Sequence, residues 1–589
     1  MADRSANPTT PPSSTTPRSR RATALALALL ACIAFGNARD GEFLYDDFPY
    51  VADNLQAQQP TAHRILLEPL AGRPELGLYR PLPLLTYALQ SRGRGKEAPT
   101  WPFHAFNVAC HAGVALLVWR LGLALALGDG VAALGAALFA VHPCHLEAVN
   151  WIVGRAELLA ALFGLGFLVL ALRDPTIRRA RDVVGAALLL ALAALSKESA
   201  FALPFVLIVL ELALGRSVRI GALVRRHWPW AVVLAALLAL RIAALSDFDA
   251  SGPRGRVIRF GPAISLAPFA DLPWPKRLLV AGQLLGEYFR RTLLPLPPRI
   301  FFHQREFEEL APWSVAGAIV WLAGLALAWR RPPLQAALLA FPVSLLTVLN
   351  LRPIQETFAE RFLYLPSAFA LLAVAAPLAA LVARERARRG RVGLSLLAPA
   401  GVAAALLVAT WSWNPIFDGA LPLWRHNVAC APDLPFPHYQ FAYFLHDHAI
   451  YLRRDAETPG AVDEYETALK LNDEIVRRGY DGMPPDQRIR AHLSLGEILL
   501  ERLPEGRRDP RRAREQIEKA IEVGEATAEL DLDLGRALFL YSRFSRLAVG
   551  VSDAQAGRAL DRALKLKLPD ELRKRINDDL DQLRARRVP

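Results

Sequence analysis

Long apolar runs separated by short basic or polar stretches dominate the first 413 residues of the chain. Most runs have about the 20 residues that a helix needs to cross the hydrocarbon core of a bilayer, although some are shorter. This pattern predicts a polytopic, all-α membrane domain with about eleven spans. The expected spans are about 22–38, 102–126, 131–148, 151–172, 183–196, 199–215, 228–245, 312–329, 333–350, 361–383 and 392–413.

The basic loops between these runs predict the orientation of the chain. Arginine-rich loops stay on the cytosolic side of a membrane. With a cytosolic N-terminus, the loops 173–181, 216–226, 330–331 and 384–391 all lie on that side. Lys197-Glu198 interrupts the long run 183–215, which predicts a helical hairpin with its tip outside. We therefore expect a multi-pass protein of the cell inner (plasma) membrane whose last span exits on the extracytoplasmic side.

Residues 246–311 form a large outer segment that is rich in proline and aromatic residues. Its apolar part, 278–285, is too short for a span because Arg290 and Arg291 follow it. We expect this part to be re-entrant or interfacial.

The polar pattern changes beyond Trp413, where charged helices replace the membrane-length runs. We expect a linker over 414–436 and an extracytoplasmic helical domain over 437–589. Small residues recur at equivalent places, so two helices can pack closely, and this pattern resembles tetratricopeptide repeats. The expected helix pairs are 437–453 with 460–478, 486–503 with 509–524 and 527–548 with 553–567, followed by a closing helix to about 586.

Composition supports this division. The chain is 53% hydrophobic, and its net charge of +13 is explained largely by arginine in the short loops, so nucleic acid is not needed as a partner. Its four cysteines predict no disulfide framework. Residues 1–21 are rich in Ser, Thr and Pro and end in arginines, which predicts a disordered cytosolic tail ahead of an uncleaved first helix over 22–38.

An acidic pair, Asp46-Asp47, directly follows the first span. Carboxylates are costly to place at a lipid boundary, so those that occur there are expected to face an aqueous cavity. A solvated turn is the alternative for the pair taken alone. What favours a functional site is that the other polar clusters of the membrane domain fall on the same predicted side.

These clusters sit at the outer ends of several predicted spans. A histidine at a helix end is more often an interfacial residue than a ligand, and Lys197 and Glu198 can simply neutralise each other. Interfacial residues without a common role would be distributed over both faces of the membrane, however, whereas these clusters all fall on one predicted face. The candidate site residues beyond the acidic pair are Arg80, His104, Asn107, His142, His145, Glu147, Arg155, Glu157, Lys197, Glu198, Glu360, Arg361 and Tyr364.

A carboxylate near several cations suits the transfer of a sugar from a lipid phosphate. The carboxylate can act as the general base for an acceptor hydroxyl, and arginine or lysine can stabilise the departing phosphate. A proton-coupled transporter would also use such residues, but nearer the membrane midplane and with internal symmetry, which the sequence lacks.

The ordered set of motifs resembles the transmembrane and tetratricopeptide-repeat-containing O-mannosyltransferases, which are C-type (GT-C) glycosyltransferases that use polyprenyl-phosphate sugars. The similarity extends over most of residues 22–480. The motifs that carry it are Phe43-Leu44-Tyr45-Asp46-Asp47, Tyr79-Arg80-Pro81-Leu82, Phe103-His104-Ala105-Phe106-Asn107, His142-Pro143-Cys144-His145-Leu146-Glu147, Gly154-Arg155-Ala156-Glu157, Ser196-Lys197-Glu198 and Ala359-Glu360-Arg361-Phe362-Leu363-Tyr364.

This resemblance implies a GT-C-type domain over 22–413, a lipid-phosphate sugar donor, and a repeat domain that engages a protein or glycan acceptor. It also implies that Asp46 is the catalytic base and that Asp47, also catalytic, contacts acceptor or donor. The repeat region is short and irregular, which puts a cadherin-like acceptor in doubt. A composition rich in Ala, Arg and Leu with only two Met suggests a high-GC bacterium and an undecaprenyl rather than a dolichol donor.

We therefore predict a membrane glycosyltransferase that transfers a mannose-like sugar to a protein or envelope-glycan hydroxyl. No cofactor can be assigned, although the acidic pair could hold Mg²⁺ or Mn²⁺ beside a phosphate. The alternative is a non-enzymatic, membrane-anchored repeat scaffold for envelope assembly, which would not need Asp46-Asp47 or Glu360-Arg361.

Overall fold

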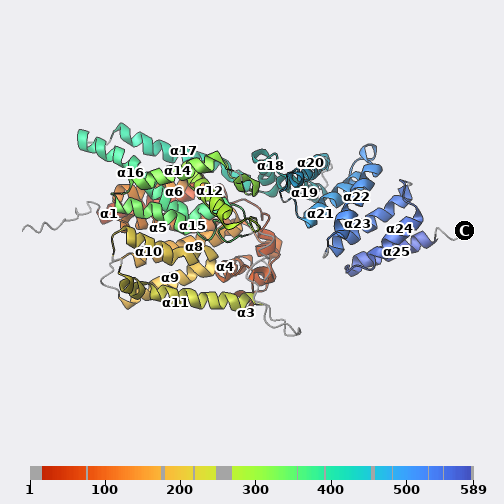
Figure 1. Ribbon diagram of the computed structural model, residues 1–589, viewed down its shortest axis with the longest axis horizontal. Helices are drawn as coiled ribbons and strands as arrows, with labels where there is room; N and C mark the ends of the chain where they lie inside the picture. The colour runs from red at the N-terminus through yellow and green to blue at the C-terminus, as the bar shows by residue number, and fades with distance from the viewer. Residues whose placement is uncertain are drawn as a thin grey trace, which may run out of the picture. The chain divides into compact units, whose positions relative to one another are not determined.

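The computed structural model describes residues 16–73, 77–173, 179–216, 219–246, 268–308, 310–354, 356–390, 393–452, 458–480, 482–527, 530–547 and 549–585. Within these ranges every regular element is a helix, which confirms the all-α architecture. The chain forms two compact units, Met1–Gly419 and Ala420–Pro589. Figure 1 shows their helices, and each unit is described separately below.

The first unit contains seventeen α-helices among its described residues, together with short connecting turns of helix. The α-helices are α1 (Pro17–Ala34), α2 (Leu55–Gln58), α3 (Ala62–Leu67), α4 (Pro81–Ser91), α5 (Trp101–Ala124), α6 (Asp129–Val141), α7 (Leu146–Asn150), α8 (Arg155–Ala171), α9 (Ala180–Ser196), α10 (Leu203–Ala213), α11 (Ile220–Leu245), α12 (Trp274–Leu293), α13 (Arg305–Glu308), α14 (Pro312–Leu327), α15 (Pro332–Leu345), α16 (Tyr364–Arg389) and α17 (Leu397–Trp413). The short turns include η1 (Phe48–Ala52), η5 (Pro143–His145), η6 (Ile152–Gly154), η7 (Glu198–Ala202) and η9 (Glu360–Leu363).

The core of this unit is a set of roughly parallel and antiparallel apolar helices. Helix α5 packs on α1, α6 and α8, while α16 packs on α6 and α15. Helices α12 and α14 cross closely, at a point where a Cβ atom on Gly286 would lie 1.8 Å from the carbonyl oxygen of Ser314. Only glycine allows two backbones to approach so closely, so this contact fixes the position of α12 against the bundle.

Five helical segments in the described part are long and apolar enough to cross a membrane, or six if the pair 129–141 and 143–150, bent by 56°, counts as one. Helices α14 and α15 are shorter apolar helices. These helices support a multi-pass membrane protein, while the number of eleven spans stays a prediction.

Some of the boundaries predicted from the sequence agree with the structure, and others do not. Helix α9 ends at Ser196 and α10 begins at Leu203, so the 183–215 run is indeed broken at Lys197-Glu198. The 278–285 segment lies inside the continuous helix α12, and no re-entrant turn occurs within that helix. Helix α1 begins at Pro17, so the arginines at 18, 20 and 21 are helical and do not belong to a disordered tail. Residues 1–15 and 247–267 lie outside the described ranges.

The second unit contains α18 (Ala420–Cys430), α19 (Pro435–Leu452), α20 (Thr458–Arg477), α21 (Pro485–Glu497), η13 (Ile498–Arg502), α22 (Pro510–Glu525), α23 (Asp531–Arg543), η15 (Phe544–Leu547), α24 (Asp553–Ala563) and α25 (Asp570–Ala585). Helices pack in the pairs α19 with α20, α21 with α22 and α23 with α24.

Small residues allow these pairs to approach. A Cβ atom on Gly496 would lie 2.6 Å from Ile517, and one on Gly535 would lie 2.5 Å from Leu568. Ala520 is fully buried at the same kind of contact. The three helix pairs and the closing helix thus fall where the sequence predicts them, but α18 lies within the expected linker over 414–436. A tetratricopeptide identity for this unit stays a prediction.

Candidate active site

The loop that follows α1 is held rigidly by one member of the acidic pair. Asp47 is fully buried, and its two carboxylate oxygens accept hydrogen bonds from the backbone N–H groups of Leu44 and Val153, each at 2.9 Å. The indole of Trp151 donates to the carbonyl of Leu44 at 3.2 Å. The loop is therefore tied to η6 at two points, since Val153 lies in that turn.

Aromatic and aliphatic side chains bury the same loop. The ring of Phe43 meets that of Phe103 edge to face, with 5.8 Å between ring centroids. Phe43 and Val51 belong to one apolar cluster with Phe103 and Ile152. Tyr45 has a φ of 34°, a conformation that few side chains other than glycine adopt. This strained turn directly precedes the acidic pair.

Asp46, the other member of the pair, is half-buried and turns toward charged side chains. Burial raises the pKa of its carboxyl to about 6, and this rise is opposed by the positive charges of Arg361 and Arg80 and reinforced by the negative charges of Glu356 and Glu147. A carboxyl with this pKa is mostly ionised at neutral pH yet remains a useful proton acceptor.

Arg361, at the start of η9, is oriented by two carboxylates. Its backbone N–H donates to Glu147 at 2.8 Å, its guanidinium also bonds Glu147, and a second guanidinium nitrogen donates to Glu356 at 2.9 Å. The guanidinium lies 5.6 Å from the ring centroid of Trp151. Its side chain is 16% exposed, so one face of a fixed cation remains open to solvent.

Arg80 is held in a similar way at the start of α4. It donates to Glu198 through two nitrogens at 2.9 and 3.2 Å, and Arg241 of α11 donates to the same carboxylate at 3.0 Å. These two positive charges hold the pKa of Glu198 down to about 2, although burial opposes this. Arg241 also bonds the carbonyl of Gly77. The cluster joins the first loop to α11.

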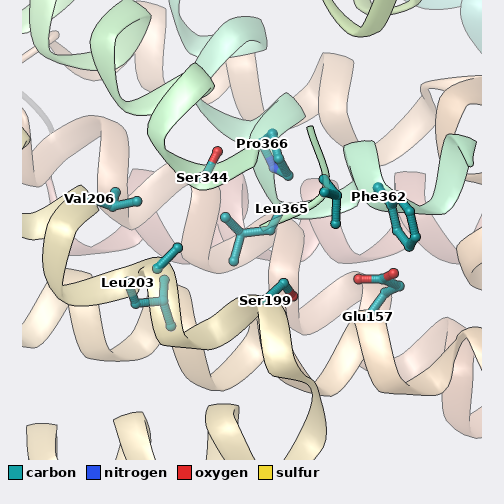
Figure 2. Close-up of a pocket in the computed structure, with 10 residues that line it drawn as sticks. Glu157, Ser199, Leu203, Val206, Ser344, Phe362, Leu365 and Pro366 are labelled. Carbon is teal, nitrogen blue, oxygen red and sulfur yellow. The ribbon is translucent and has the colours of Figure 1, made fainter. Parts of the chain in front are cut away.

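Lys197 and Glu157 form a buried ion pair beside this cluster. The ammonium nitrogen lies 4.6 Å from the ring centroid of Phe362. Figure 2 shows Glu157 next to Phe362, with the apolar side chains of Leu203 and Leu365 on the other side of a small cavity. The cavity has about 20 Å³, room for roughly one water molecule, so it cannot itself hold a sugar.

Several predicted site residues instead build the scaffold beneath the loop. Arg155 is fully buried and donates to Asn107 at 2.9 Å, to Thr86 at 3.0 Å and to the carbonyl of Phe103 at 3.0 Å. Asn107 in turn donates to the carbonyl of Trp151 at 3.1 Å. Arg155 therefore has no open face for a donor phosphate, and it positions the turn that carries Trp151.

The histidines belong to the same interior. His104 donates to the carbonyl of Gly41 at 3.1 Å, and the amide of Cys144 donates to His142 at 3.1 Å. His145 hydrogen-bonds the hydroxyl of Ser367 at 2.8 Å. All three histidines are buried and make their hydrogen bonds inside the protein, so they are neither at the membrane interface nor open to a substrate in this structure.

Glu360 and Tyr364 are buried and have their partners in other parts of the membrane unit. Glu360 is paired with Arg291 of α12 and accepts a hydrogen bond from the backbone of Arg299. The Tyr364 hydroxyl lies 2.7 Å from a ring nitrogen of His111 and is buried. Both residues lock the start of α16 in place, which fixes the position of Arg361 between them.

The structure thus divides the predicted residues into two groups. One group surrounds Asp46, and the other supports it from within. In the first group Arg80, Glu147 and Arg361 act on Asp46 directly, and Glu157, Lys197 and Glu198 are linked to those charges. The second group is Asp47, His104, Asn107, His142, His145, Arg155, Glu360 and Tyr364.

Sequence reasoning missed three charged partners: Arg241, Glu356 and Arg291. An arginine within the apolar run 228–245 was a detectable signal, because a charge inside a span needs a partner. Among the described residues, no three His, Cys, Asp or Glu side chains converge as metal ligands.

Comparison with known proteins identifies relatives of part of the chain. It is 33% identical over 160 residues to the human protein O-mannosyl-transferase TMTC4, a match that covers 24% of this chain and 22% of that protein. It is 37% identical over 172 residues to human TMTC1, covering 26% and 19%. It is 30% identical over 235 residues to Tmtc2 of Drosophila melanogaster, covering 38% and 25%. No protein-family model matches.

These matches confirm the resemblance to this group of O-mannosyltransferases that the motifs predict. They are shorter than the expected range of 22–480, and the chain spans about a fifth to a quarter of these relatives' length. Among solved structures, the apo oligosaccharyltransferase of Archaeoglobus fulgidus aligns with a TM-score of 0.38 and 13% identity, covering 69% of this chain and 56% of that one. The same enzyme with an inhibitory peptide and a dolichol-phosphate aligns with a TM-score of 0.40.

Proposed function

We propose that this chain is a membrane glycosyltransferase that transfers a mannose-like sugar from a polyprenyl phosphate to a hydroxyl group on the extracytoplasmic side. The observation that carries the proposal is the setting of Asp46. A half-buried carboxylate with a pKa of about 6 lies in the field of two fixed arginines, Arg80 and Arg361, that each keep a partly exposed face. Similarity to O-mannosyltransferases supports the class of reaction.

In this proposal Asp46 accepts the proton of the acceptor hydroxyl as its oxygen forms a bond to the anomeric carbon of the sugar. The bond between that carbon and the phosphate oxygen breaks, and the electron pair leaves with the lipid phosphate. Arg361 and Arg80 stabilise the negative charge that develops on the leaving oxygen, without a proton-transfer step of their own. The carboxylates that hold both arginines provide the preorganisation, because the cations need not move during the reaction.

Asp47 has a different role in the proposal from the one the resemblance implies. Asp47 is fully buried and both its oxygens accept hydrogen bonds from backbone N–H groups, so its carboxylate is shielded from an acceptor or a donor. We assign it as a positioning residue that fixes the loop and aims Asp46. Arg155 acts in the same way through Asn107.

The acceptor is proposed to be a protein or an envelope glycan that the second unit engages. A groove of about 370 Å³ runs along the first helices of the helix pairs, with residues from α19, α21 and α23. Arg490 and Arg536 give it positive charge, and Asp447 and Glu497 give it negative charge. The ring nitrogen Nε2 of His446 is buried there without a hydrogen-bond partner among the described residues. Such a polar groove suits an extended polar chain rather than an apolar helix.

The test uses the full-length protein in lipid nanodiscs with a synthetic polyprenyl phosphate that carries radiolabelled mannose. Envelope material from the source cell serves as the acceptor. The proposal expects label in the protein or glycan fraction with the native chain and a loss of about 10²- to 10⁴-fold with Asp46→Asn, the range typical of a general base. Equal transfer by the two proteins would remove Asp46 from the mechanism.

The non-enzymatic scaffold is the second candidate. It predicts no consumption of any polyprenyl-phosphate sugar and an unchanged envelope phenotype for Asp46→Asn. The fixed Arg361–Glu147 and Arg80–Glu198 pairs favour the enzyme, because a scaffold has no need of oriented cations around a half-buried acid.

A further inference from the structure

A large cavity lies at the other end of the helical bundle from Asp46. It has a volume of about 1040 Å³, a size typical of a ligand site, and its walls come from α1, α5, α6, α8 and α9. Helix α5 contributes residues to both the cavity and the candidate active site, so the distance between them can be worked out along this helix. On α5, His104 lies at the active-site end and Arg120 borders the cavity 16 residues later, which is roughly 24 Å along the axis.

Three arginines from three separate segments border this cavity. Arg20 lies in the first turns of α1, Arg120 in the last turns of α5, and Arg173 just beyond the end of α8. Arg120 and Arg173 are exposed. One carboxylate, Asp129 at the start of α6, is also at the rim. The rim therefore carries more positive than negative charge.

The walls below the rim are apolar. Leu117, Val169 and Leu189 line the cavity from three helices, and Gly166 leaves room between them. A free phosphate would need only the cations, whereas apolar walls suit hydrocarbon chains. Basic pockets between membrane helices on the cytosolic face are suited to anionic lipid head groups.

We propose that this cavity binds an anionic phospholipid, with the phosphate head group among Arg20, Arg120 and Arg173 and an acyl chain along Leu117, Val169 and Leu189. The site is separate from the proposed sugar transfer and does not depend on it. Charge complementarity selects the anionic lipid over a neutral one, and the apolar walls select a lipid over a soluble anion.

The experiment measures lipid binding to the full-length protein by native mass spectrometry, with added phosphatidylglycerol or phosphatidylcholine. The native chain should retain phosphatidylglycerol in preference to phosphatidylcholine. Arg120→Gln with Arg173→Gln should weaken phosphatidylglycerol binding about 30-fold, since each arginine near a membrane surface contributes about fivefold. The matched control is Arg330→Gln with Arg331→Gln, a basic pair in another loop that does not line the cavity, and it should leave binding unchanged.

A second variant tests the chain-binding walls without changing charge. Gly166→Leu adds an apolar side chain toward Leu189, which a Cβ atom would already approach to 3.5 Å. It should weaken phosphatidylglycerol binding, and inorganic phosphate should not displace the lipid from the native chain. Equal retention of the two phospholipids, equal losses in the control pair, or displacement by inorganic phosphate would each overturn the proposal.

Discussion

The replacement Asp46→Asn should remove activity and at the same time make the protein more stable. Burial of a carboxylate raises its pKa to about 6 from an ordinary value of 3.8. At neutral pH the carboxyl is ionised in both the folded and the unfolded chain, and its ionisation is less favourable in the folded one. Above pH 6 the raised pKa therefore lowers the free energy of unfolding by at most about 3 kcal/mol.

An amide of the same size carries no charge and avoids this loss. We therefore expect Asp46→Asn to have a higher melting temperature than the native protein at pH 7.5, with a smaller difference at pH 4.5, where the carboxyl is protonated in the fold. The assay is thermal unfolding of the purified protein in detergent at the two pH values. A lower melting temperature at pH 7.5 would refute the reasoning, because it would mean that the ionised carboxylate stabilises the fold.

Activity should follow the same titration. The base must be deprotonated, so kcat/KM should rise with pH and level off above the pKa of about 6; at pH 5 it should be about tenfold below the plateau. Glu356→Gln removes a negative charge that raises the pKa of Asp46, so its profile should move to lower pH. The Glu356 side chain is 46% exposed, which makes this variant a mild one for folding. An unmoved profile would show that the kinetic group is not Asp46.

The remaining predictions concern the supports of the site and the arrangement of the chain. Asp47→Ala should lower the melting temperature, since the buried N–H of Leu44 loses its acceptor at about 1–3 kcal/mol and the part-buried N–H of Val153 loses its acceptor as well. Arg361→Lys should lower kcat as well as raise KM for the donor lipid, because lysine cannot keep the forked contacts to two carboxylates that aim the charge at the leaving phosphate. Ala520→Arg should unfold a soluble 420–589 fragment that is otherwise helical by circular dichroism, because that position is fully buried between helices. Reporter fusions after Gly41 and after Pro435 should both report the extracytoplasmic side; a disagreement would show that the hairpin at 183–215 is misassigned.

The helix pairs of the second unit could be predicted from the sequence for a physical reason. Their apolar residues recur with helical spacing and their capping residues are local, as in the capping box of Ser552 and Gln555 at α24. The membrane unit is different, because almost every residue of an apolar helix is apolar. Periodicity cannot then separate a lipid-facing helix from a buried one, and helices such as α14 are shorter than a bilayer needs.

The candidate site was predictable as a set of residues but not as a division of roles. Motif order identified Asp46 and Asp47 together, yet only the fold shows that Asp47 bonds two backbone N–H groups and that Asp46 does not. Arg155 seemed a plausible phosphate ligand until its three hydrogen bonds were seen to be internal. Tertiary partners decide which of two similar side chains is free to react, and adjacent positions in the sequence carry no information about those partners.

The charges around Asp46 affect how readily the lipid phosphate product of the proposed reaction would dissociate. Five carboxylates accompany four cations there, so the cluster itself has no surplus of positive charge. The cations are Arg80, Lys197, Arg241 and Arg361, and the carboxylates are Asp46, Glu147, Glu157, Glu198 and Glu356. A sugar phosphodiester carries one negative charge, whereas the lipid phosphate left after transfer ionises a second time with a pKa of about 6. With one carboxylate in excess, the cluster has no net positive charge with which to hold this doubly charged product more tightly than the donor, so the spent lipid can leave as readily as the fresh one arrives.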